Sequence, residues 1–197
     1  DAFSEHDATY LSTVASQASV AFENARLYEL ATVDSLTGLY IRRYFNARLA
    51  EEFERSRRYG GAFTLIMIDV DWLKSINDTY GHPTGDRVLC QVARIIREET
   101  RLVDIPARLG GDEFSVLLPN LETENGLMVA ERMRAAIASL PILEGTKQLK
   151  VTVSMGVVSY PQLTAGSPEQ MVSAADKALY KAKMTPVRNQ VVLWQPE

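Results

Sequence analysis

Residues 108–118 organise this sequence, and they read Arg108-Leu109-Gly110-Gly111-Asp112-Glu113-Phe114-Ser115-Val116-Leu117-Leu118. Two glycines, which tolerate positive φ, separate two apolar runs, so the stretch predicts a tight β-hairpin followed by a buried strand. Asp112 and Glu113 would lie at the hairpin tip. Because adjacent strand residues point to opposite faces, we expect these two carboxylates to have different roles. Taken alone, the pattern also fits an acidic hairpin that faces solvent.

A second acidic cluster ends the apolar run Phe63-Thr64-Leu65-Ile66-Met67-Ile68-Asp69-Val70-Asp71. Such a run predicts a strand buried on both faces, with Asp69 and Asp71 at its C-terminal end, where ligands gather in open α/β sheets. If the hairpin strand is its neighbour, Asp69 and Asp112 would lie side by side and form an oxygen-only site for a hard cation. Mg²⁺ suits this set better than zinc, because no Cys or His cluster is available. The alternative is a pair of strand-terminal aspartates in solvent.

Five motifs follow one another along the chain: Asp34-Ser35-Leu36-Thr37-Gly38-Leu39, Asp69-Val70-Asp71-Trp72-Leu73-Lys74, Asn77-Asp78-Thr79-Tyr80-Gly81-His82-Pro83-Thr84-Gly85-Asp86, Gly110-Gly111-Asp112-Glu113-Phe114 and Ala175-Asp176-Lys177-Ala178-Leu179-Tyr180-Lys181-Ala182-Lys183. In this order they resemble the GGDEF-domain diguanylate cyclases, bacterial enzymes that make cyclic-di-GMP from two GTP. The resemblance runs from about Asp34 to Leu193.

Strands and helices alternate, with antiparallel pairing at the hairpin, so we predict an α/β (α+β) fold. It would be a two-layer, ferredoxin-like palm of the nucleotidyl-cyclase type. We expect helices at 41–59, 72–80, 87–100, 123–140 and 169–184, and strands at 63–71, 115–119, 149–160 and 190–194. Residues 33–197 would form the GGDEF domain, and residues 1–32 a signalling or dimerisation helix.

The N-terminal segment from Glu5 to Ala31 contains neither Gly nor Pro. Apolar and small residues recur at three- and four-residue steps, namely Leu11, Val14, Ala18, Ala21, Ala25 and Tyr28. This predicts a coiled-coil helix that pairs with a partner helix in a homodimer, and the alternative is a helix folded back on its own domain. Residues 17–28 also resemble the last helix of a GAF sensor domain, which implies an upstream sensor domain in a longer signalling protein.

A phosphate site is predicted at the start of the short helix after Asp71, because free amides at a helix N-terminus bind anions. The resemblance implies that the amides there and one lysine hold the GTP phosphates, that two side chains read guanine, that one lines the pocket and that a last lysine touches the terminal phosphates. The phosphate-binding residues are Trp72, Leu73 and Lys74, and the guanine-reading residues are Asn77 and Asp86. His82 is the residue that lines the pocket, and Lys183 is the lysine that touches the terminal phosphates. Asn77 could instead cap the short helix, and Asp86 could be the N-cap of the next.

The last helix departs from the resemblance. Relatives have a Gly before an Arg-Asn pair at this point, whereas here Met184-Thr185-Pro186-Val187 precedes Arg188-Asn189 and is one residue longer. Lys183 lies before this departure, and its role is carried over from the resemblance. The role of Arg188 is left open, because Pro186 must end the helix differently.

Arg101 and Asp104 stand where the family has an Arg-x-x-Asp inhibitory site that binds the product. Arg132 falls where relatives supply a further product contact. An i, i+3 ion pair between Arg101 and Asp104 would need no ligand and is the alternative.

The implied reaction is the condensation of two GTP into cyclic-di-GMP and two pyrophosphates across a homodimer. Two Mg²⁺ ions per half-site would be held by Asp69, the Val70 carbonyl and Asp112, with Asp112 favoured over Glu113 as the base. The alternative is a non-catalytic GTP or cyclic-di-GMP receptor, although such receptors usually lose an acidic residue of the motif. A cyclase with relaxed base choice, which Asp86 disfavours, and a pure dimerisation element are the other rivals.

Composition narrows the remaining possibilities. The 197 residues are 46% hydrophobic and carry a net charge of −4, which fits one globular domain with an appendage and argues against a nucleic-acid coat. The single cysteine, Cys90, is expected to be a small core residue. The sequence offers no disulfide framework, signal peptide or membrane-spanning run, so we expect no membrane in this fragment and a cytoplasmic location.

Overall fold

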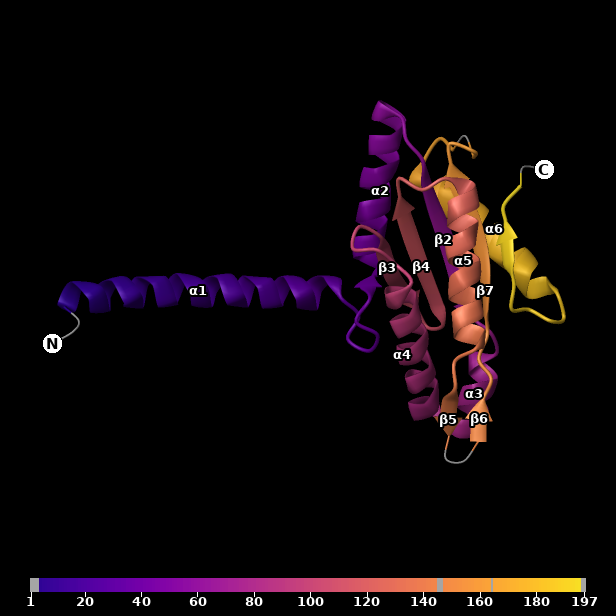
Figure 1. Ribbon diagram of the computed structural model, residues 1–197, viewed down its shortest axis with the longest axis horizontal. Helices are drawn as coiled ribbons and strands as arrows, with labels where there is room; N and C mark the ends of the chain where they lie inside the picture. Colours follow the sequence, from indigo (N-terminus) through magenta and orange to yellow (C-terminus); the bar gives the residue numbers. More distant parts are fainter. Residues whose placement is uncertain (1–3, 145–146, 164, 196–197) are drawn as a thin grey trace.

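A six-stranded mixed sheet forms the centre of the protein, as the computed structural model of residues 4–144, 147–163 and 165–195 describes it (Figure 1). Its strands, in spatial order, are β1 (Tyr40–Ile41), β3 (Ile105–Gly110), β4 (Glu113–Pro119), β2 (Phe63–Val70), β7 (Val153–Tyr160) and β8 (Val191–Leu193). The central strand β2 pairs antiparallel with both β4 and β7, while the two outer pairs, β1 with β3 and β7 with β8, are parallel.

Helices cover both faces of this sheet, and the central strand β2 is therefore buried along its whole length. Ile66 and Ile68 face one core, which includes α4 (His82–Glu98) and α5 (Thr123–Ala138) as well as α3 (Leu73–Tyr80). Leu65 and Met67 face the other core, which is built by α2 (Arg42–Tyr59) and α6 (Pro168–Met184). The predicted mixed α/β class is confirmed. The sandwich has three layers where the sequence suggested two, because alternate residues of β2 bury apolar side chains on opposite faces.

The helix α6 lies unusually close to β7. A Cβ atom on Gly156 would come within 2.2 Å of the Ala175 carbonyl oxygen and 2.3 Å of the Leu179 nitrogen, so only glycine fits at this position. This approach carries the C-terminal end of α6, with Lys183, to the end of β2.

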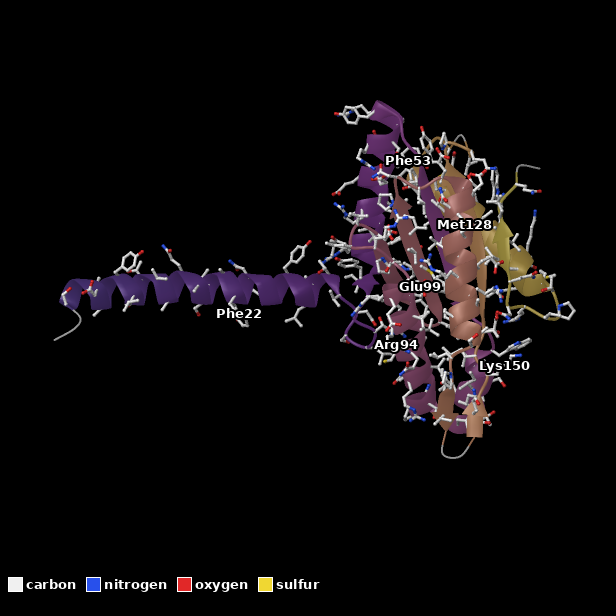
Figure 2. The ribbon with its side chains drawn as sticks, viewed as in Figure 1. Phe22, Phe53, Arg94, Glu99, Met128 and Lys150 are labelled. Carbon is white, nitrogen blue, oxygen red and sulfur yellow. The ribbon has the colours of Figure 1, made fainter. Side chains whose placement is uncertain are left out.

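The first helix, α1 (Glu5–Thr32), projects away from the rest of the protein (Figure 1). Of the predicted apolar stripe, Leu11, Val14 and Tyr28 are all exposed. Phe22 is 73% exposed on the projecting part of the helix (Figure 2). The helix is therefore not folded back on its own domain. Across the described residues, no helix combines the length and apolar character needed to cross a membrane.

Several element boundaries differ from the prediction. The helix expected at 87–100 begins at His82, with Gly81 (φ 84°) as the N-cap and Pro83 in the first turn. Asp86 therefore lies inside α4, and the alternative that it is the N-cap of this helix is wrong. The strand expected at 149–160 is divided into β6 (Lys147–Leu149) and β7, and β6 pairs with β5 (Ile142–Glu144) in a small hairpin that was not predicted.

Candidate active site

The predicted hairpin is present between β3 and β4, and both of its glycines adopt positive φ, 143° at Gly110 and 53° at Gly111. The ladder passes from Arg108 opposite Phe114 to Gly110 opposite Glu113, so Leu109 is a bulged residue. A bulge of this kind re-aims the side chains that follow it.

The register places Glu113 directly opposite Asp69, where the sequence suggested Asp112. Asp112 lies in the turn, and its carbonyl oxygen accepts a hydrogen bond of 3.1 Å from the Val70 amide. Its carboxylate is still close enough to act electrostatically on Asp69. The three acidic side chains gather at one end of the sheet, with Glu113 as the cross-strand partner and Asp112 at the turn.

Asp69 is buried, with 3% of its surface exposed, so the alternative of aspartates in solvent is wrong. Burial raises the pKa of Asp69 to about 6, and the charges of Asp112 and Asp71 raise it as well. Lys183, whose Nζ lies 2.6 Å from Asp69 Oδ2, lowers it in part. The site therefore holds a carboxylate whose ionised form needs more positive charge than Lys183 supplies.

The Asp71 side chain is held by hydrogen bonds within the protein and does not face solvent. Its buried carboxylate accepts hydrogen bonds of 2.8 Å from both Thr152 Oγ1 and Ser154 Oγ, and one of 3.2 Å from the Asn189 amide. These bonds tie the end of β2 to β7 and to the segment that precedes β8.

The residues present fit Mg²⁺ that is held partly by a substrate. Within the described residues, no group of three or more His, Cys, Asp or Glu side chains is arranged to hold a metal ion by itself. Asp69, the Val70 carbonyl and Asp112 offer only hard oxygen atoms, and Asp69 is buried with too little positive charge nearby. Mg²⁺ suits such a set, because it commonly binds one or two carboxylates and completes its coordination with phosphates and water.

The start of α3 lies beside these carboxylates. Its N-cap residue, Trp72, adopts the left-handed conformation (φ 61°) and is 58% exposed, and the N-cap makes no side-chain hydrogen bond to the helix. Leu73 is buried and Lys74 is exposed. No N-cap side chain therefore occupies the first amides of α3. A phosphate site at this helix start requires such uncapped amides.

Arg188, which the sequence left open, returns to this helix start. Its guanidinium carbon lies 3.9 Å from the centre of the Trp72 ring, and its Nη1 lies 3.8 Å from Asp71 Oδ1. The longer loop after α6 accommodates this with left-handed backbone at Arg188 (φ 48°) and Asn189 (φ 49°). An exposed aromatic residue at the helix start was the one sequence signal for this contact.

Asn77 lies where α3 meets α4. Its Oδ1 is buried and is one of two such side-chain atoms without a hydrogen-bond partner among the described residues. A Cβ atom on Gly85 would lie 1.9 Å from this oxygen, so the glycine makes room for the amide. Asn77 does not cap α3, because it lies inside the helix. Asp86 and His82 are exposed in the first turns of α4.

The predicted inhibitory residues gather at the C-terminal end of α4. Asp104 is buried, burial raises its pKa, and its Oδ2 accepts a 2.7 Å hydrogen bond from the Arg101 amide. The turn is thus closed through the backbone, while the Arg101 side chain is exposed beside a cleft of about 540 Å³. Arg132 of α5 pairs with the Glu99 carboxylate and donates a 3.0 Å hydrogen bond to the Glu99 carbonyl.

Asp34 fastens the segment before α2 to the hairpin. Its Oδ1 accepts hydrogen bonds from the Thr37 amide (2.9 Å), the Thr37 hydroxyl (2.7 Å) and Arg108 (3.2 Å). Burial alone would raise the pKa of Asp34, but these bonds outweigh it and hold the pKa below its usual value. Arg108 in turn donates to the Gly111 carbonyl (2.9 Å), so it supports the hairpin tip from within.

Comparison with known proteins places these features in one family. The family described as "Diguanylate cyclase, GGDEF domain" matches residues 31–189. Diguanylate cyclase A of Treponema denticola is 39% identical over 194 residues, which are 97% of this chain and 52% of that protein. The response regulator PleD of Caulobacter vibrioides is 39% identical over 169 residues, which are 83% of this chain and 36% of that protein. The chain thus spans about half, or less, of these curated relatives.

Solved structures agree. Diguanylate cyclase SiaD of Pseudomonas aeruginosa, in complex with its activator SiaC, superposes with a TM-score of 0.80 at 39% identity over 96% of this chain and 74% of that one. The coiled coil and GGDEF domain of DgcB from Caulobacter crescentus, in complex with c-di-GMP, superposes with a TM-score of 0.85 at 26% identity over 96% of this chain and all of that one.

Proposed function

This chain belongs to the GGDEF family of diguanylate cyclases, and we propose from this premise that it condenses two GTP into cyclic-di-GMP and two pyrophosphates. One observation carries the proposal: the complete Gly-Gly-Asp-Glu hairpin lies opposite a buried Asp69 whose ionised form needs more positive charge than Lys183 supplies. A site of this kind suits a metal-bound triphosphate.

The reacting end of GTP would lie across the hairpin. Asp69, the Val70 carbonyl and Asp112 are the residues that would hold Mg²⁺, two ions per half-site. Bound Mg²⁺ would neutralise phosphate charge and make the attacking 3′-hydroxyl more acidic. Asp112, half-buried in the turn, is the base that we favour to take the hydroxyl proton, and Glu113 is the second candidate.

The phosphates and the base would be held by different elements. The first amides of α3, with Trp72, Leu73 and Lys74, form the phosphate site, and Lys183 would turn from Asp69 to the terminal phosphates. Asn77 and Asp86 would read the guanine edge, because guanine offers N1 and N2 donors to a carboxylate and to an amide oxygen. The buried, unpartnered Asn77 Oδ1 supports this reading. His82 would line the same pocket.

Two subunits would be needed for one product, since each 3′-hydroxyl attacks the α-phosphate of the other GTP. The exposed apolar stripe of α1 supports a homodimer in which this helix sets the distance between the half-sites, and an upstream sensor domain could change that distance. The relative DgcB, which contains a coiled coil and a GGDEF domain, supports the same arrangement.

Product inhibition is proposed at the end of α4. The exposed Arg101 would bind guanine or phosphate of cyclic-di-GMP, Asp104 would bind the base, and Arg132 would add a further contact. The cleft beside Arg101 and the position of Arg132 next to Glu99 support this grouping.

The test is incubation of the purified chain with GTP and Mg²⁺, with ATP in a parallel tube, followed by chromatography of the nucleotides. We expect cyclic-di-GMP from GTP alone. Asp112→Ala should lower the rate by at least about 100-fold, and Glu54→Ala, an exposed carboxylate on α2, should leave it unchanged. Measurable GTP or cyclic-di-GMP binding without any product would overturn the cyclase in favour of the receptor. Parent-like turnover by Asp112→Ala would refute the role given to Asp112.

A further inference from the structure

The first residue of α2 holds the hairpin from outside the sheet. Arg42 Nε donates a 2.8 Å hydrogen bond to the Leu109 carbonyl, and Arg42 Nη2 lies 3.3 Å from Glu113 Oε2. One guanidinium therefore binds a backbone carbonyl on β3 and a side chain on β4. No sequence motif pointed to this contact.

The carbonyl that Arg42 binds belongs to the bulge. Leu109 is the residue that the β3–β4 ladder skips, and the pairing that follows sets Glu113 opposite Asp69. A bulged residue lacks the ladder bonds that hold its neighbours, so its position depends on contacts from outside the ladder. Arg42 supplies such a contact and also binds the side chain that the bulge aims.

The charges around Glu113 explain why a cation is needed there. A cleft of about 340 Å³ lies between α2, α6 and the hairpin, and Arg42 is the only cation among its described lining residues. The lining also carries Glu113, Glu169 and Asp176. Burial and the charge of Glu113 raise the pKa of Asp176, whereas Arg42 and Lys183 lower it. Without Arg42, Glu113 would face Asp176 with less compensation and be repelled from this position.

We propose that Arg42 is a positioning residue, which clamps the Leu109 carbonyl and the Glu113 carboxylate so that the hairpin acids keep their place opposite Asp69. The proposal rests on the cyclase activity for its effect on rate, but the clamp itself is a property of the structure. The ion pair is half-exposed on both sides, with 56% of the Arg42 side chain and 48% of the Glu113 side chain accessible. Such pairs contribute little to stability, so the clamp should affect geometry more than unfolding.

Hydrogen–deuterium exchange without nucleotide tests the clamp directly. In Arg42→Gln, amides of residues 108–114 should exchange about 10-fold faster than in the parent, and Arg42→Lys, which keeps the charge but not the forked geometry, should lie between. Arg57→Gln is the matched control, because it removes an exposed arginine and an ion pair from the same helix, far along it from the hairpin. The melting temperature of Arg42→Gln should fall by less than about 3 °C. Parent-like exchange at the hairpin would overturn the proposal.

Kinetics with a double-mutant cycle tests the consequence. Arg42→Gln should lower kcat for cyclic-di-GMP formation about 10-fold and change KM for GTP less than about twofold, with partial recovery in Arg42→Lys. In a Glu113→Gln background, the same substitution should lower kcat by a smaller factor than in the parent, since the Glu113 carboxylate is already gone and only the bond to the Leu109 carbonyl is lost. Independent, multiplying losses would refute action through Glu113. If the parent makes no product, the cyclase proposal fails, while the exchange experiment still decides the clamp.

Discussion

Asp69 owes its raised pKa to its burial at the end of β2. The apolar run before it predicts the strand, and the strand buries the carboxylate where, among the described residues, Lys183 is the one cation that pairs with it, at 2.6 Å. A pKa of about 6 means that ionising Asp69 in the folded, metal-free protein costs about 3 kcal/mol more than in the unfolded chain.

This cost predicts a pH dependence of stability with a definite sign. Between about pH 4 and pH 6 the folded state binds the Asp69 proton more tightly than the unfolded state, so the free energy of unfolding contributed by this group falls as pH rises. Urea unfolding in EDTA, compared between the parent and Asp69→Asn, should show a difference that changes by about 3 kcal/mol across this window. Lys183→Met should extend the upper end of this window to higher pH, because the ammonium lowers the pKa of Asp69 in the folded state. A difference that is flat with pH would contradict the assignment.

At the scale of elements, the packing of α3 against α4 depends on a glycine, Gly85. Gly85 lies in the first turns of α4, and a Cβ atom there would overlap Asn77 Oδ1 at 1.9 Å. Within the motif from Asn77 to Asp86, Gly85 thus has a packing role beside the proposed binding roles of Asn77 and Asp86. Because Gly85 has no side chain, α4 can lie close to Asn77 of α3.

Gly85→Ala should therefore displace Asn77 and weaken recognition of the base. Alanine suits a helix, so we expect an increase in KM for GTP of about 10-fold, equal to about 1.4 kcal/mol, with a smaller effect on kcat. Gly166→Ala is the matched control, because no atom lies closer than 3.5 Å to the new Cβ. An unchanged KM in a folded Gly85→Ala protein would remove Asn77 from the proposed guanine site.

At the scale of the whole molecule, α1 stands apart from the three-layer domain (Figure 1). Its apolar side chains are largely exposed, and they include Leu11, Val14 and Phe22. Val20, Leu27 and Leu30 are exposed as well. A helix that is apolar and unpacked gains stability from a partner, which is the physical basis of the proposed homodimer.

Val14→Asp should weaken this pairing and make the reaction depend more steeply on protein concentration. At low protein concentration we expect the rate of cyclic-di-GMP formation to fall about 10-fold, with recovery as concentration rises, because the two half-sites must then meet by diffusion. Ser19→Asp, on another side of the exposed helix, should behave as the parent does. Rates measured over a protein dilution series, beside sedimentation velocity, check this, and equal curves for all three proteins would count against pairing through α1.

Local sequence patterns predicted the main elements and suggested the candidate residues of the proposed site. The β2 run, the glycine hairpin and the Gly-free first helix each follow from short-range rules of burial, backbone freedom and helix propensity, and the motifs between them identified the family. Boundaries were less well predicted. The sequence predicted the start of α4 at Arg87, whereas the helix begins at His82, with Gly81 as the N-cap and Pro83 in the first turn.

Other features depend on how distant segments meet. The bulge at Leu109 sets Glu113, not Asp112, opposite Asp69, and strand register across a bulge is a property of the pairing, which no single strand encodes. Contacts between Lys183 and Asp69, and between Arg188 and Trp72, join residues more than one hundred positions apart. They exist because Gly156 lets α6 lie against β7. This close packing depends on the shapes of both elements together. It brings Lys183 and Arg188 to the edge of the sheet where Asp69 and Trp72 lie.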